Sequence, residues 1–196
     1  MAVVSIKNKL RRGNLLVGNE AFDPFGFSSI ATTTLSTTQT TVTFSNIPQI
    51  YDHLQIRSVN RVAYPGVSTV SSPQMRFNGD TGSNYSNYRW GTFGSGTFSD
   101  YENNQNIMGG IGWTAGATAD SNTFGAFIMD IHNYTNTNTV KTVKTQPGVT
   151  GTFGGWAAQT ANTWYSTAAI TEINLIENSN YGWIAGSQFA LYGIKA

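Results

Sequence analysis

Short runs in which apolar and polar residues alternate recur along most of the chain. Val42 and Phe44 are separated by a threonine, so both side chains should lie on one face of a strand. Leu54 and Ile56 repeat this pattern within residues 53–62. Similar runs cover residues 74–77, 139–145, 169–176 and 188–195. Alternation over about four to eight residues is typical of half-buried β-strands.

Two segments depart from simple alternation. Residues 124–131 are apolar on both faces, with Phe124, Ala126 and Ile128 on one and Phe127, Met129 and Ile131 on the other. Such a run predicts a central strand that is covered on both sides. Residues 31–43 are rich in threonine, a composition that also fits a low-complexity linker. We interpret them as strand, because threonine is β-branched and fits a pleated surface.

These runs predict an all-β protein. No window carries the apolar stripe of an amphipathic helix between helix caps. Turn clusters at Asn78-Gly79-Asp80 and Gln146-Pro147-Gly148 are expected to separate strands. Closely spaced strands without helices indicate a sandwich or a closed barrel, and about eight runs favour a jelly-roll-like antiparallel β-sandwich.

An N-terminal arm is expected to precede this domain. Pro and Gly within residues 23–26 mark a boundary, which divides the chain into an extended arm, residues 1–26, and a β-sandwich domain, residues 27–196. The arm is cationic up to Glu20 and is predicted to be an attachment segment, although a frayed, solvated terminus is the alternative. Its expected contacts are Lys7, Lys9, Arg11 and Arg12, with Leu15, Leu16, Val17 and Phe22 as apolar anchors.

Composition adds an unusual surface to this picture. Only 11% of the 196 residues are charged, against roughly 25% in ordinary soluble domains. Glycine, threonine, serine and asparagine fill the polar positions, so burial in a larger assembly is expected. A net charge of +1 gives no global reason to expect nucleic acid or a membrane surface as partner. Absent cysteines exclude disulfides, and no apolar run reaches the ~18 residues of a transmembrane helix.

Catalytic chemistry has little support in the sequence. His53 and His132 are the two histidines. Asp130 and His132 should share one strand face, but a metal site there needs further donors, so we expect ordinary hydrogen bonding. Residues 78–84 offer oxygen donors without the carboxylate spacing of a calcium loop. We therefore expect a protein that is not an enzyme, without catalytic, cofactor-binding or metal-binding residues.

Aromatic residues are the stronger sign of a binding surface. Six of them crowd a region rich in glycine, serine and asparagine, and are candidates for a distal or partner contact: Tyr85, Tyr88, Trp90, Phe93, Phe98 and Tyr101. Flat rings beside amides and hydroxyls suit protein contacts and can also stack on sugar rings. Large aromatic residues are mostly buried, so about half of the chain's aromatic residues should belong to the core or to subunit interfaces.

Four segments resemble virion structural proteins of tailed phages, especially cyanophages. They are FSSIATTTLSTTQTTVTFSNIPQIYDHLQIRSVNR, MRFNGDTGSNYSNYR, FGAFIMDIHNYTNTNTVKTVKT and FALYGIKA, and the resemblance covers residues 27–196. The leader SIKNKLRRGNLLVGNEAFDP resembles N-terminal segments of phage structural proteins.

The resemblance implies a particle component in the virion without catalytic residues. We expect a neck or tail fibre, or another receptor-facing protein, held by its arm. The alternative is a capsid decoration protein that stabilises the head shell, and a carbohydrate-binding or glycan-degrading module ranks below both. The expected partners are other tail, neck or capsid proteins, two further copies in a homotrimer, and a host surface glycan, with neither membrane nor nucleic acid.

Overall fold

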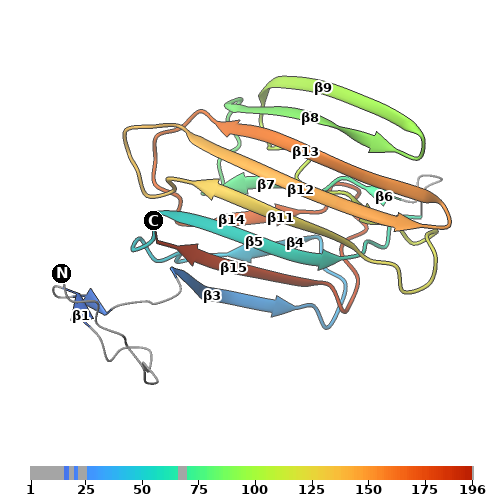
Figure 1. Ribbon diagram of the computed structural model, residues 1–196, viewed down its shortest axis with the longest axis horizontal. Helices are drawn as coiled ribbons and strands as arrows, with labels where there is room; N and C mark the ends of the chain where they lie inside the picture. The colour runs from blue at the N-terminus through green and yellow to red at the C-terminus, as the bar shows by residue number, and fades with distance from the viewer. Residues whose placement is uncertain (1–15, 18–19, 22–25, 66–69, 196) are drawn as a thin grey trace, which may run out of the picture.

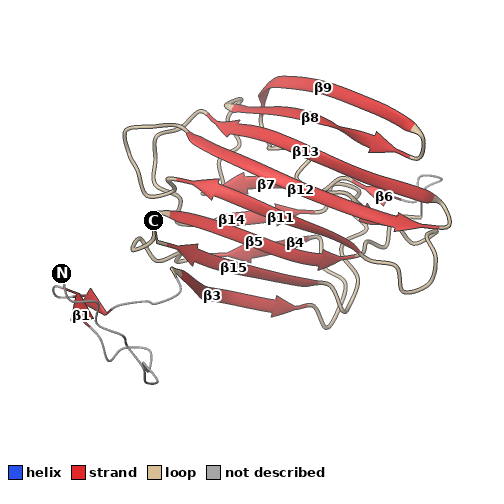
Figure 2. Ribbon diagram, in the orientation of Figure 1, coloured by secondary structure: helices blue, strands red, loops and turns tan. Residues whose placement is uncertain are grey.

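The computed structural model describes residues 16–17, 20–21, 26–65 and 70–195, and these residues form strands and loops without a helix (Figures 1 and 2). Eight strands form one antiparallel sheet. Their order is β3 (Phe27–Thr34), β15 (Gln188–Ile194), β5 (His53–Asn60), β11 (Gly125–His132), β12 (Lys141–Gly151), β13 (Gly154–Trp164), β8 (Tyr85–Phe93) and β9 (Gly96–Gln105).

A second, smaller sheet lies behind the large one in the view of Figure 1. Its order is β4 (Thr41–Phe44), β14 (Ile173–Ile176) and β7 (Gln74–Phe77). Two short antiparallel pairs complete the described strands: β1 (Leu16–Val17) with β2 (Glu20–Ala21), and β6 (Val70–Ser71) with β10 (Thr114–Ala115). Neither of the two larger sheets closes on itself, so the all-β expectation is confirmed in the form of an open, sandwich-like pair of sheets.

The main core lies between the two sheets, as alternation predicts. Val42 and Phe44 of β4 are buried on one face, and Leu54 and Ile56 of β5 are buried opposite them in the same cluster. In both β4 and β5, the polar residues between these apolar positions point away from the core. The cluster also contains Met75, Phe77, Met129, Ile131, Val143, Ile173, Leu175, Phe189 and Leu191.

Pro147 does not end a strand, contrary to the turn predicted at residues 146–148. It lies inside β12 and is paired with Phe127 of β11. Proline has no backbone N–H to donate, and the ladder between β12 and β13 is interrupted at this point, resuming at Gly148. The strand continues because β11 holds it from the other side. By contrast, the turn predicted at Asn78-Gly79-Asp80 is confirmed by the hydrogen bond from the Asp80 N–H to the Phe77 carbonyl.

The central strand β11 is covered by the chain on one face only. Phe127, Met129 and Ile131 are buried toward the small sheet. Ala126 and Ile128 point the other way and are exposed, so the prediction of a strand covered on both sides is wrong for the described residues. The large sheet therefore has an open face, which carries apolar side chains in its middle.

The Asp80 turn is fastened to the core. Its carboxylate accepts hydrogen bonds from the Gly82 N–H, the Asn84 amide and the Trp164 indole, the last at 2.7 Å. Burial raises the pKa of this carboxyl, but the three hydrogen bonds outweigh burial and hold the pKa below its ordinary value. The neighbouring Tyr85 phenol is buried, and this burial raises its pKa to about 12.

Acid should therefore weaken the fold through Asp80. Because the folded-state pKa lies below that of the unfolded chain, the stabilisation is fully present above about pH 4 and is lost as the pH falls through the folded-state value. We expect Asp80→Asn to be less stable than wild type by about 1–2 kcal/mol near pH 7 in urea unfolding. The variant should lose less stability than wild type between about pH 7 and pH 3. An equal acid-induced loss in both proteins would contradict this role.

Candidate functional site

The open face of the large sheet, which is turned toward the viewer in Figure 1, holds the candidate site. On the hairpin of β8 and β9, alternation separates two kinds of side chain. The face toward the core carries Asn87, Arg89 and Asp100, and Arg89 pairs with Asp100 at 2.7 Å. Asn87 is buried and accepts a hydrogen bond from the Gly109 N–H, which ties the hairpin to the adjacent loop. The polar face thus anchors the hairpin and leaves its opposite face free.

Three aromatic residues occupy that free face, and we call them the aromatic strip. They are Tyr88, Trp90 and Tyr101, with 45%, 50% and 61% of their surfaces exposed. Tyr88 and Tyr101 are direct cross-strand partners. Trp90 follows Tyr88 by two residues, so both lie on the same side of β8. Three of the six aromatic residues singled out in the sequence are therefore brought together on one surface.

The other three lie elsewhere. Tyr85 is fully buried in the main core, where its ring stacks against Trp164, so it is unsuited to the surface contact predicted for it. Phe98 is partly buried in a second apolar cluster with Trp113 and Trp156. Phe93 is half exposed and stacks on Trp156 at 4.8 Å between ring centroids.

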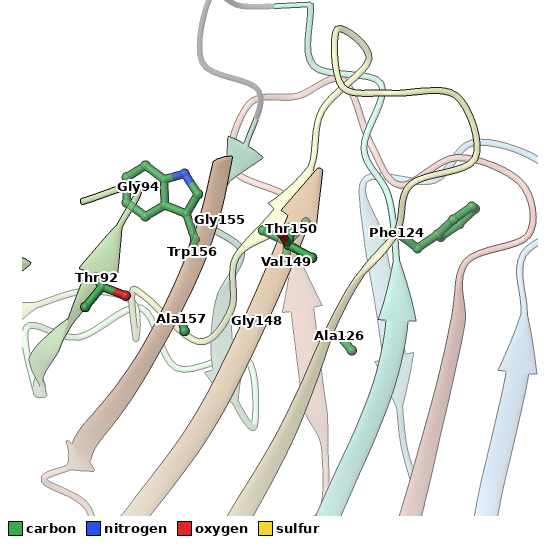
Figure 3. Close-up of a pocket in the computed structure, with 10 residues that line it drawn as sticks. All are labelled: Thr92, Gly94, Phe124, Ala126, Gly148, Val149, Thr150, Gly155, Trp156 and Ala157. Atoms are coloured by element: carbon green, nitrogen blue, oxygen red, sulfur yellow. The ribbon is translucent and has the colours of Figure 1, made fainter. Parts of the chain in front are cut away.

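A shallow groove of about 500 Å³ begins beside the aromatic strip. Its floor is made of small residues, Ala157, Gly148 and Ala126, from three neighbouring strands. Figure 3 shows the rings of Trp156 and Phe124 on either side of this floor, at the strand ends. The remaining lining residues are Thr92, Gly94, Val149, Thr150 and Gly155. None of the ten lining residues is charged.

Two further depressions continue the groove across the sheet. All three depressions are lined by Ala126. The depression that is also lined by Ile128 and Tyr192 reaches Thr32 on the edge strand β3. Six strand spacings of about 4.8 Å separate β8 from β3, so the joined groove extends over roughly 29 Å. Arg57 is the one charged residue among its lining residues, and its guanidinium lies 5.0 Å from the Phe27 ring centroid. The groove is therefore almost neutral over its whole length.

Asp130, which the sequence places on one strand face with His132, is hydrogen-bonded, and so is His53. The Asp130 carboxylate accepts from the Gln55 amide at 2.7 Å, and His53 Nδ1 accepts from the Asn133 N–H at 3.1 Å. His53 and His132 lie side by side, with 5.3 Å between their ring centroids. Among the described residues, no three histidine, cysteine, aspartate or glutamate side chains gather closely enough to hold a metal ion.

The predicted attachment arm falls almost entirely outside the described residues. Lys7, Lys9, Arg11, Arg12, Leu15 and Phe22 lie outside them. Leu16 and Val17 form β1, which pairs with β2. The role of the arm stays a prediction.

The groove itself had no signal in the sequence. Ala126, Gly148 and Ala157 are unremarkable residues in separate segments, and they form one floor only through the register of β11, β12 and β13. The outward position of Trp90 likewise depends on strand β8, which sequence alternation does not reveal.

Comparison with known proteins gives no match: no family model, no curated protein and no solved structure matches this chain. Within the described part of the chain, no helix is present that has the length and apolarity needed to cross a membrane.

Proposed function

We propose that this protein is a non-enzymatic structural component of a tailed-phage virion, a neck or tail fibre or another receptor-facing protein, anchored through residues 1–26. The resemblance of the sequence to virion structural proteins supports the particle context. The resembling segments supply β3, β4, β5, β7, β11 and β15, together with the Asp80 turn. They contribute part of the main core, which also contains Ile173 and Leu175 of β14 and Trp164 of β13.

The observation that carries the proposal is the open face on the central strand β11. Ile128 of β11 and Val59 of β5 are 42% and 50% exposed, Val59 is paired with Ala126, and Ala190 lies on the same face. Arg57 is paired with both Ile128 and Ala190, so the apolar residues surround one cation. Exposed apolar residues grouped on one face are a sign of protein contact. A chain with only 11% charged residues also has little charge repulsion against close packing of copies. A neighbouring subunit in a homotrimer, or another particle protein, would cover the middle of this face, around Ile128, and leave the β8–β9 end open.

We also propose a jelly-roll-like topology for the two sheets. We assign the sandwich to the jelly-roll-like class because the chain passes repeatedly between the two sheets. It runs from β3 to β4, returns to β5, crosses to β7 and returns to β8. The strands nearest the two ends of the domain, β3 and β15, are paired.

Removal of the arm's charges tests the anchoring. In full-length protein, replacing Lys7, Lys9, Arg11 and Arg12 by glutamine should reduce incorporation into particles, because these residues orient the arm on its partner. The melting temperature of the isolated protein should stay the same. Incorporation is measured by quantitative immunoblotting of purified particles, with the wild-type protein as the reference. Normal incorporation of the fourfold variant would contradict the anchoring role.

Images of labelled particles test the location. Label at the neck or tail is the expected result. Label distributed over the head, with shells of the arm variant that rupture at lower temperature while adsorption is unchanged, would replace the fibre role with capsid decoration.

A further inference from the structure

Three exposed aromatic rings on one surface need a physical reason. Single exposed apolar residues are common, whereas adjacent ones form a patch that solvent disfavours. Tyr88, Trp90 and Tyr101 are adjacent by strand pairing and are not drawn into either apolar cluster. The β8–β9 hairpin is already held by its polar face, so the strip is not needed to fix it in place.

The direct neighbours of the strip are uncharged hydrogen-bonding groups, and a cation on the same face, Lys144, lies two strands away from Tyr88. Trp90 is paired with Gln159 of β13 on one side and with Ser99 of β9 on the other. Thr92 and Thr97 are paired in the next row on the same face. The ion pairs of this hairpin, from Arg89 to Asp100 and Glu102, belong to the opposite face. The surface thus offers flat apolar rings bordered by amides and hydroxyls.

This combination favours a carbohydrate over a charged or purely apolar ligand. A pyranose ring has an apolar C–H face that stacks on an aromatic ring and hydroxyls at its edge that bond amides and hydroxyls. Charged polymers such as nucleic acid need several cations, and Arg57 is the one charged residue that lines the joined groove. A second copy of the chain is better accommodated on the apolar middle of the face, around Ile128.

The groove gives the ligand its extended form. Thr92 lies two residues after Trp90 and lines the groove, so the strip leads directly into it. The part of the floor nearest the strip, Ala157 and Gly148, leaves room for a chain to lie across β13 and β12, beside the apolar middle around Ile128.

From these contacts we infer that the aromatic strip, with Gln159 and the adjoining groove, is a binding site for an uncharged polysaccharide chain. Trp90 stacks on one sugar ring, Tyr88 and Tyr101 on a neighbouring one, and Gln159 bonds the sugar hydroxyls. The inference names the ligand class for the receptor-facing role and rests on that proposed function.

The test uses the purified full-length protein and neutral oligosaccharides of six residues: glucose in α-1,4 and β-1,4 linkage, β-1,4-linked N-acetylglucosamine and α-1,6-linked mannose. Nuclear magnetic resonance titration of the tryptophan indole N–H signals reports where each binds. We expect the Trp90 signal to shift with at least one of them, and the affinity to be independent of salt between about 50 mM and 500 mM, because no ion pair forms. Trp90→Ala should weaken binding about tenfold or more.

A matched variant separates the strip from general aromatic exposure. Tyr181 is 49% exposed in the loop after β14, away from β8 and β9, and Tyr181→Ala should bind like wild type. Trp90→Phe keeps a ring and should retain part of the affinity. Unchanged thermal unfolding of Trp90→Ala shows that any loss is local.

Three outcomes overturn the inference: no binding of any of the four oligosaccharides, full binding by Trp90→Ala, or self-association of wild type that Trp90→Ala abolishes. The last would make the strip a subunit contact. The proposed function is tested separately, by incorporation of the arm variant with an intact strip, so failure of this inference is distinguishable from failure of the proposed function.

Discussion

Replacing Trp164 by alanine is expected to lower the free energy of unfolding by about 3–5 kcal/mol. The side chain is 2% exposed and lies at the end of β13. Its ring packs against Phe77 and Tyr85, with centroid distances of 5.4 and 6.4 Å, and its indole N–H donates to Asp80. The substitution removes the ring, leaves a cavity between the sheets and frees one acceptor of the turn. Urea unfolding near pH 7, followed by fluorescence, measures the loss.

Two variants separate packing from hydrogen bonding. Trp164→Phe keeps an aromatic ring and loses the indole N–H, so it should lose less stability than the alanine variant. Trp90→Ala removes the same side chain from an exposed position and should cost less than about 1 kcal/mol. Equal losses in Trp164→Ala and Trp90→Ala would show that Trp164 is not part of the core.

Replacing Arg61 by methionine is expected to cost about 3 kcal/mol. Arg61 follows β5 and is buried, and its guanidinium donates to four backbone carbonyls of one loop. These carbonyls belong to Ala117, Ala119, Asp120 and Thr123. Methionine fills much of the volume but donates no hydrogen bond, so the loop loses the donor that organises it.

The consequence should be local as well as global. Amide hydrogen exchange should accelerate across residues 117–123 in Arg61→Met before it does so in β11 or β12. Arg57→Met, on the exposed face of the preceding strand β5, is the matched control and should change stability by less than about 0.5 kcal/mol. Unchanged exchange in the loop of Arg61→Met would contradict its organising role.

Strands whose core-facing residues are apolar were predictable from the sequence. In β4 and β7 each buried position is occupied by an apolar residue within the predicted run. In β5 the first two buried positions, Leu54 and Ile56, are apolar, and the last two are the polar Ser58 and Asn60. Burial is then visible directly in the pattern. The ends of strands were less predictable, since β12 runs on to Gly151 through a proline that local rules assign to a turn.

Strands β8, β9 and β13 were not predictable in this way. Their core-facing positions include Asn87, Arg89, Thr160 and Asn162, which are buried or half-buried but polar. Hydrogen bonds to partners distant in sequence make this burial tolerable, as with Asn87 and Gly109. Because their core-facing side chains are polar, these strands show no alternation of apolar and polar residues. From the sequence, residues 85–101 were therefore interpreted only as an aromatic region rich in glycine, serine and asparagine.

The candidate site was also predictable only in part from the sequence. Composition identified the aromatic cluster, but the separation of Tyr88, Trp90 and Tyr101 from buried Tyr85 follows from the register of the β8–β9 hairpin. Tyr85 and Tyr88 differ by an odd number of positions, so they lie on opposite faces of the strand.

The sequence by itself determined the β class, the main apolar core and the aromatic, weakly charged character of the surface, because these depend on side-chain chemistry and on a period of two. The tertiary structure alone decided which face of the large sheet stays open, where the groove runs and which aromatic rings reach it. Those features arise from pairing between strands far apart in the chain. Their register cannot be read where neither face of a strand is purely apolar.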